Sequence, residues 1–125
     1  MDRDRFEILV AQAVEALPVE FQEKLENIDV VVEDRPSRDQ LRGTRRGYTL
    51  LGLYEGMPLT ERGSHYGLVP PDKITIFQKT IEEECRDAGD ARIQKEIQDV
   101  VRHEIAHHFG ISDARLQEIE EERKE

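Results

Sequence analysis

The amino-acid sequence predicts an α+β fold in which a small sheet supports one long helix. Apolar residues recur every three or four positions in residues 6–17 and again in residues 93–105, which is the spacing of amphipathic helices. Short runs rich in β-branched residues, 28–32 and 73–77, lie between these two segments and are typical of strands. We therefore expect a mixed sheet of three or four strands, with helices packed mainly on one face and the long helix lying across it.

Length, charge and cysteine content narrow the class of protein. A chain of 125 residues is expected to form one domain, residues 1–125. Its net charge of −10 argues against a nucleic-acid partner, because phosphates require a basic surface. The single cysteine, Cys85, rules out an intrachain disulfide and zinc-ribbon spacing. With no apolar run long enough to cross a bilayer, we expect a soluble, cytoplasmic protein with no membrane partner, and the oligomeric state stays open.

The first third of the chain predicts two helices and a strand. The apolar stripe of residues 6–17 ends at Pro18, which suits the first turn of a second short helix. Residues 28–32 follow as a strand, and their adjacent β-branched side chains predict burial on both faces. Residues 33–47 are polar and rich in arginine, so we favour a mobile loop over a substrate-binding flap.

The middle of the chain predicts two more strands. Residues 48–55 form the first, in which Gly52 allows close approach of the backbone to a neighbouring element. Residues 73–77 form the second, followed by a helix over residues 79–86. Between the two strands lies an irregular rim that contains His65 and Tyr66. A phenol or imidazole there can stabilise an oxyanion, but surface or hydrogen-bonding roles are commoner for both residue types.

The long helix carries an anomaly in its apolar stripe. Asp90 is the expected N-cap, and at about 100° per residue Glu104 falls among the core positions. A buried carboxylate is costly unless it is paired or lies near a cation. A purely structural helix would carry leucine at this position, so the anomaly predicts a functional site. His108, by contrast, is interpreted as a core residue or a support to the metal ligands. A last helix is expected over residues 114–123.

The surrounding residues complete a hydrolytic zinc site. His103 and His107 are four residues apart, so that both imidazoles can reach one metal ion from a single helix face. Glu104 can face a metal-bound water without binding the metal. Gly110 tolerates the positive φ that ends a helix, and Asp113 can then turn back as a third ligand. Alternatively, Ser112 or Asp113 caps the following helix, and the two roles of Asp113 are compatible.

The run from His103 to Asp113 resembles the HExxHxxGxxD signature of zincin-type metallopeptidases. The whole chain is similar to the family of small bacterial zincin-like metallopeptidase domains, and the similarity extends to residues 30–34, 51–56 and 71–77. The zinc motif is by far the most specific part of the resemblance. The resemblance implies a zincin-like fold with HExxH on a long helix, and a peptide substrate that lies extended beside an edge strand.

The resemblance also implies an activity, namely peptide-bond hydrolysis through a zinc-bound water with Glu104 as general base and Zn²⁺ as cofactor. The expected partner is a peptide or protein substrate. Two departures from larger relatives stand out: Asp113 replaces the third histidine of metzincins, and no methionine follows the motif. A gluzincin-like ligand from Glu118, Glu121 or Glu122 is the alternative to Asp113. The alternative function is a zinc-binding interaction module with little or no turnover.

Overall fold

A computed structural model describes residues 1–42, 50–56, 72–86 and 88–124. For Asp113, Glu120 and residues 122–124 it describes the backbone alone. The elements, in chain order, are α1 (Arg3–Glu15), α2 (Val19–Leu25), β1 (Ile28–Glu33), α3 (Arg38–Leu41), β2 (Gly52–Glu55), β3 (Asp72–Phe77), α5 (Gln78–Cys85), α6 (Asp90–Phe109) and α7 (Asp113–Lys124).

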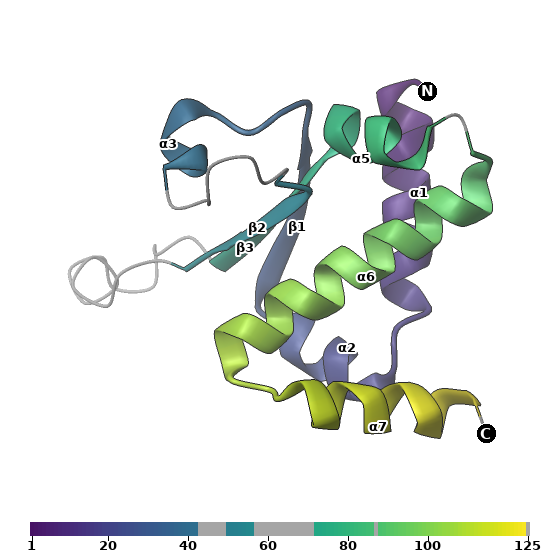
Figure 1. Ribbon diagram of the computed structural model, residues 1–125, viewed down its shortest axis with the longest axis vertical. Helices are drawn as coiled ribbons and strands as arrows, with labels where there is room; N and C mark the ends of the chain where they lie inside the picture. Colours follow the sequence, from purple (N-terminus) through teal and green to yellow (C-terminus); the bar gives the residue numbers. More distant parts are fainter. Residues whose placement is uncertain (43–49, 57–71, 87, 125) are drawn as a thin grey trace.

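The three strands form one mixed sheet in the order β1-β3-β2. β1 pairs with β3 in parallel, with Val30 opposite Ile74, and β2 pairs with β3 in antiparallel register, with Tyr54 also opposite Ile74. β1 and β2 are therefore the outer strands of the described sheet. Figure 1 shows α1 and α6 on one side of this sheet and the single-turn α3 on the other. The predicted α+β architecture is confirmed.

The hydrophobic core lies between the sheet and α1 and α6. The stripes predicted for the two helices are the ones that are buried, including Phe6 and Leu9 from α1 and Ile97, Val101 and Ile105 from α6. Burying a side chain of this size contributes about 1.5–3 kcal/mol relative to leaving it exposed. The core thereby fixes how α6 lies across the sheet, and with it the position of the histidine motif.

Gly52 sets the distance between α6 and β2. A Cβ atom built at this residue would lie 2.4 Å from Val100 Cγ1 and 3.2 Å from the Thr75 carbonyl oxygen. Real Cβ atoms do not approach a carbon so closely, so any larger side chain would push the helix away from the strand. The close backbone approach expected at Gly52 is thus confirmed, and its partner is the zinc-motif helix.

The expectation that the first strand is buried on both faces is wrong. All six residues of β1 are half-buried or exposed, with Asp29 and Glu33 exposed. β1 lies at the edge of the sheet, whereas β3 lies in the middle and carries the fully buried Ile74, Thr75, Ile76 and Phe77. Adjacent β-branched residues occur in both strands, so residue type alone does not distinguish a central strand from an edge strand.

Two local expectations also need correction. The N-cap of α6 is Gly89 and not Asp90, which lies in the first turn and forms an ion pair with Arg5 of α1. In the segment predicted as a loop, α3 forms one turn closed by a capping box in which Ser37 and Gln40 bond each other's backbone amides. The spacing of serine and glutamine by three is the usual signature of such a box. The remainder of that segment, residues 43–47, lies outside the described residues.

The other predicted elements agree with the structure within a few residues. β2 is shorter than residues 48–55, because Leu50 and Leu51 precede the strand and residues 48–49 are not described. The helix expected at 79–86 is α5, and the last helix is α7. Among the described residues, none of the helices is both long and apolar enough to span a membrane.

Candidate metal and catalytic site

The end of α6 has the geometry that the glycine predicts. Gly110 has a φ of +69°, and the Ile111 amide donates to the Ala106 carbonyl oxygen at 2.9 Å across the helix end. This is the Schellman arrangement, which satisfies a carbonyl group left free by the last helical turn. The chain consequently leaves α6 in a sharp turn and begins α7 at Asp113 only three residues later.

Ser112 caps the start of α7. Its Oγ accepts a hydrogen bond from the Arg115 amide at 3.1 Å, and its carbonyl oxygen accepts one from the Leu116 amide at 2.9 Å. Of the two residues considered for this cap, the structure selects Ser112. Asp113 is the first residue of the helix, and its side chain lies outside the described part of the structure.

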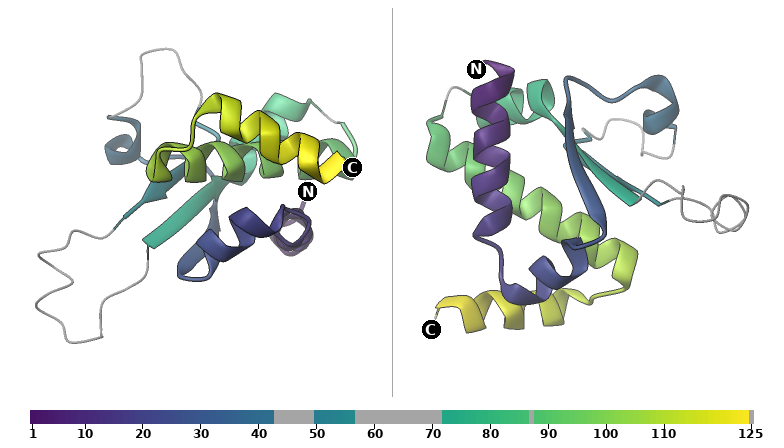
Figure 2. Two further views of the ribbon diagram at one scale, coloured as in Figure 1. Left: turned by 90° about the horizontal axis from the view of Figure 1, so that it is seen from below. Right: turned by 180° about the vertical axis from the view of Figure 1, so that it is seen from behind.

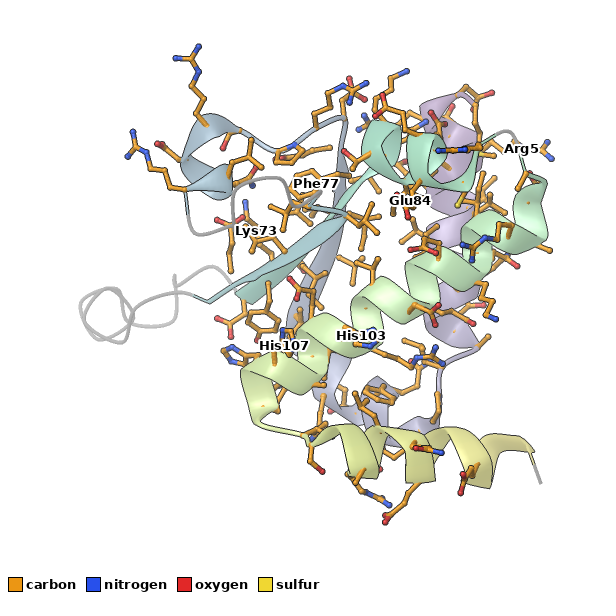
Figure 3. All side chains as sticks on the ribbon, viewed as in Figure 1. Arg5, Lys73, Phe77, Glu84, His103 and His107 are labelled. Carbon is orange, nitrogen blue, oxygen red and sulfur yellow. The ribbon has the colours of Figure 1, made fainter. Side chains whose placement is uncertain are left out.

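The two motif histidines lie on neighbouring turns of α6, both exposed (Figure 3). His103 Nδ1 lies 2.7 Å from the Asp99 carbonyl oxygen. A carbonyl oxygen only accepts hydrogen bonds, so Nδ1 carries the proton and Nε2 of the neutral ring keeps its lone pair. Metal-bound histidines in proteins are commonly held in this way, with the second ring nitrogen bonded to an oxygen.

Glu104 points from α6 toward β2. Its side chain is only 19% exposed, and its Oε1 accepts a hydrogen bond from the Tyr54 amide at 3.2 Å. Oε2 lies 3.9 Å from His107 Nδ1. Burial raises the pKa of the Glu104 carboxyl, while the Tyr54 amide and the two imidazoles partly offset that rise. The anomaly predicted at position 104, a carboxylate in the apolar stripe, is present.

A pocket of about 280 Å³ opens beside this carboxylate, lined by Tyr54, Glu104, His107 and His108. The His108 ring stacks on the Tyr54 ring, with centroids 3.8 Å apart and planes 14° from parallel. The Tyr54 hydroxyl donates to Asp72 Oδ2 at 2.7 Å, which fixes the other end of that ring. His108 is exposed, so its interpretation as a core residue is wrong, and it forms part of the pocket wall.

The donor atoms near the pocket suit zinc in type. Zinc binds neutral imidazole nitrogens and carboxylate oxygens, and a catalytic site needs about three protein ligands. His103 presents a free Nε2, and His107 lies one turn further along the same helix. Among the described side chains no three of the histidine, cysteine or acidic residues come together as a group that could hold a metal ion, and the Asp113 side chain lies outside the described part of the structure. The predicted rim residues Tyr66 and His65 also lie outside the described residues.

Tyr54 is a site residue that the sequence analysis did not single out. Its position follows from the alternation of the strand only once the Gly52 contact with α6 is known from the structure. Because Gly52 faces α6 at Val100, the residue two positions on faces the same helix one turn later, at position 104. Two strand residues advance about 6.8 Å, and four helical residues advance about 6 Å. The tight Gly52 contact therefore predicts the contact between Tyr54 and Glu104.

Comparisons with known proteins agree with this fold. A solved structure of a conserved hypothetical protein from Thermus thermophilus is 23% identical, with a TM-score of 0.58, and the match covers 87% of this chain and 94% of that one. At this level of identity the likeness concerns the fold alone. No curated protein matches the sequence. The sequence profile of the zincin-like metallopeptidases matches residues 25–123, which include both outer strands and the whole of α6. The chain therefore belongs to the zincin-like metallopeptidase family.

Proposed function

We propose that this protein is a zinc-dependent peptidase in which Glu104 acts as general base and His103, His107 and Asp113 hold the metal. One observation carries the proposal: a half-buried carboxylate with a raised pKa lies between two exposed histidines of one helix, at the mouth of a pocket. General bases work best when their pKa lies near the working pH, and burial moves a glutamate in that direction. Membership of the family supports the same assignment.

The proposed chemistry assigns one proton to Glu104. A zinc ion bound at this site would supply Lewis-acid chemistry, lowering the pKa of water and polarising a carbonyl group. The Glu104 carboxylate accepts one proton from the attacking water as the water oxygen adds to the scissile carbonyl carbon. Glu104 then donates that proton to the amine nitrogen as the carbon–nitrogen bond breaks. The Tyr54 amide, 3.2 Å from Oε1, orients the carboxylate for both transfers.

The outer strand β2 is the proposed place for the substrate backbone. β2 borders the pocket through Tyr54 and has no further strand beside it among the described residues. An extended peptide can add to such an edge by main-chain hydrogen bonds. His65 and Tyr66, which follow β2 in sequence, stay predictions for the group that stabilises the oxyanion.

A second candidate function is a zinc-binding interaction module without turnover. The contact that favours it is again the hydrogen bond from the Tyr54 amide to Glu104, because this bond also fastens α6 to β2. A carboxylate with only that purpose would activate no water, even with zinc bound by the neighbouring histidines. The two functions therefore differ in whether Glu104 is required for cleavage or only for stability.

The ligand set is tested by metal analysis of purified variants. His103→Ala and His107→Ala should each lose most of the bound zinc, and Asp113→Ala should weaken binding, because each removes one of about three protein ligands. The exposed Glu121 on α7 offers the matched control, and Glu121→Ala should keep its zinc. Zinc loss in Glu121→Ala together with full retention in Asp113→Ala would refute this ligand set and indicate a gluzincin-like one.

A further inference from the structure

A second concave surface lies at the opposite edge of the sheet, between α1 and β1. This α1–β1 groove has a volume of about 520 Å³ and is lined by Glu7, Val10, Ala11, Val14, Glu15, Val30, Val31 and Val32. Figure 2, in its right-hand view, shows α1 and β1 running side by side. Valine and alanine side chains form most of the lining, and the groove shares no residue with the pocket beside Glu104.

The strand wall of the groove presents an open edge. β1 pairs with β3 on one side, and no backbone group from the rest of the described chain pairs with its other side. The Val32 carbonyl oxygen has a side-chain partner instead, because it accepts a hydrogen bond from the Arg3 guanidinium at 3.0 Å. Unpaired backbone amides and carbonyls along a strand are a template for an added strand. The open stretch thus lies before Val32.

The groove is acidic at both ends of its helix wall. Glu7 and Glu15 are exposed and stand eight residues apart on α1, a distance of about 12 Å at 1.5 Å per residue. That distance matches about four residues of extended chain. None of the lining residues is basic; the nearest described cation is Arg3, which bonds the Val32 carbonyl oxygen at one end of the strand wall. The charge pattern fits an extended segment whose basic residues are about four positions apart.

We propose that the α1–β1 groove binds an extended segment of another protein, one with small branched apolar residues flanked by lysine or arginine. The segment pairs with the open edge of β1, places its apolar side chains against the valines, and sets its basic side chains beside Glu7 and Glu15. A second copy of this chain fits poorly, because two such grooves brought together would place the Glu7 and Glu15 carboxylates of both copies close to one another. Like charges at close range oppose association.

Binding of a defined peptide by fluorescence anisotropy tests the proposal. The probe is a fluorescein-labelled peptide of alternating valine and threonine with lysines four positions apart, measured at low salt with chelator present so that no zinc-dependent cleavage occurs. We expect saturable binding to the full chain. A peptide with glutamate in place of lysine should not bind, since its charges repel the rim. A peptide N-methylated along the strand should bind at least about tenfold more weakly, because it lacks the amides that pair with β1.

Charge-reversal variants locate the binding. The Glu7→Lys/Glu15→Lys double variant should weaken binding of the lysine peptide about tenfold or more, and added salt should reduce the difference. Glu23→Lys/Glu84→Lys changes two exposed residues elsewhere and gives the same net charge, so it should change binding less than about twofold. Glu7→Gln/Glu15→Gln should give an intermediate loss and covers the case in which the reversal variant does not fold.

Four results would overturn the proposal. They are absence of saturable binding up to about 1 mM peptide, equal binding of the glutamate peptide, equal loss in the Glu23/Glu84 control, and a concentration-dependent dimer that excludes the probe. The last would assign the groove to a second copy of the chain. Chelation removes zinc in every arm, so failure here is separable from failure of the peptidase assignment.

Discussion

The two outer strands of the sheet have opposite surroundings. Along β2, the amide of Tyr54 points away from β3 and donates to the half-buried carboxylate of Glu104, with His107 and His108 nearby. Along β1, the neighbouring helix contributes Val10 and Val14 to the groove, with the exposed Glu7 and Glu15 at its two ends. One edge therefore has a half-buried carboxylate bonded to the strand backbone, and the other is apolar with exposed carboxylates at its rim.

The difference shows that the helix beside a strand determines what its edge can do. α6 approaches β2 closely enough for a side chain to reach the strand backbone, because Gly52 leaves no Cβ between them. α1 packs mainly against α6, with Phe6, Leu9 and Ala13 in the shared core, and the α1–β1 groove remains between α1 and β1. The distance between helix and strand, set at β2 by Gly52, therefore distinguishes the two edges.

The largest stability effect is expected at the tight contact. Gly52→Ala places a Cβ 2.4 Å from Val100 Cγ1 and should lower the free energy of unfolding by about 1–3 kcal/mol. It should also lower peptide cleavage, because α6 and β2 can no longer hold Glu104 against Tyr54. Gly56→Ala is the matched control, since its nearest contacts are 3.6 Å or longer. Denaturant melts that place both variants within error of the parent would refute the role given to Gly52.

A smaller effect is expected where the Tyr54 ring is anchored. Tyr54→Phe removes the hydroxyl that donates to Asp72 at 2.7 Å and should lower stability by about 0.5–1.5 kcal/mol. The main-chain amide stays, so cleavage should fall less than in Gly52→Ala. On the opposite edge, Val31→Thr should change stability by less than about 0.5 kcal/mol. If chemical denaturation shows a larger loss of stability for Val31→Thr than for Tyr54→Phe, the two edges do not differ as described.

A third difference between the two edges is the pH dependence of stability, which arises from the Glu104 carboxyl beside β2. Because burial raises the pKa of Glu104, the unfolded chain loses this proton at lower pH than the folded protein does. Well below about pH 4, the usual range of a glutamate pKa, the group is protonated in both states and has no effect on stability. As pH rises through the raised pKa, the folded protein binds more protons than the unfolded chain, so its stability falls.

Glu104→Gln removes that titration. In metal-free protein the Tm of the variant minus that of the parent should be near zero at low pH, increase with pH, and then level off at no more than about 4 °C. Calorimetric scans in chelator at several pH values measure this difference. A difference that shrinks with rising pH would mean that ionised Glu104 stabilises the fold, contrary to the burial seen here.

Much of the fold followed from periodicity. The apolar stripes of residues 6–17 and 93–105 are the buried faces of α1 and α6, and Gly110 ends α6 with positive φ as expected. These features depend on local geometry, which the sequence carries directly. The burial of β1 was mispredicted because the position of a strand in a sheet depends on non-local pairing with β3. The N-cap was misplaced because glycine caps through its backbone, whereas Asp90 pairs with Arg5.

The site was predictable along the helix but not across the sheet. Spacing alone placed His103, Glu104 and His107 on α6, and the cost of burying a carboxylate identified position 104 as unusual. Tyr54 comes from another element, so its contact with Glu104 required the strand register and the Gly52 approach. The core position predicted for His108 is wrong for the same reason, since its stacking partner is on β2, and its role as a support to the metal ligands stays a prediction. The roles given to Asp113, His65 and Tyr66 stay predictions.

The central claim is that Glu104 transfers protons in peptide hydrolysis, and one comparison tests it most directly. Parent and Glu104→Gln, each loaded with zinc, are compared for zinc content and for cleavage of an unfolded protein. We predict equal zinc content and a loss of cleavage of about a hundredfold to ten-thousandfold, which is the usual contribution of a general base. Glu96→Gln, changed on the same helix outside the motif, should behave as the parent. Cleavage by Glu104→Gln at the parent's rate, with zinc retained, would contradict the hydrolytic assignment.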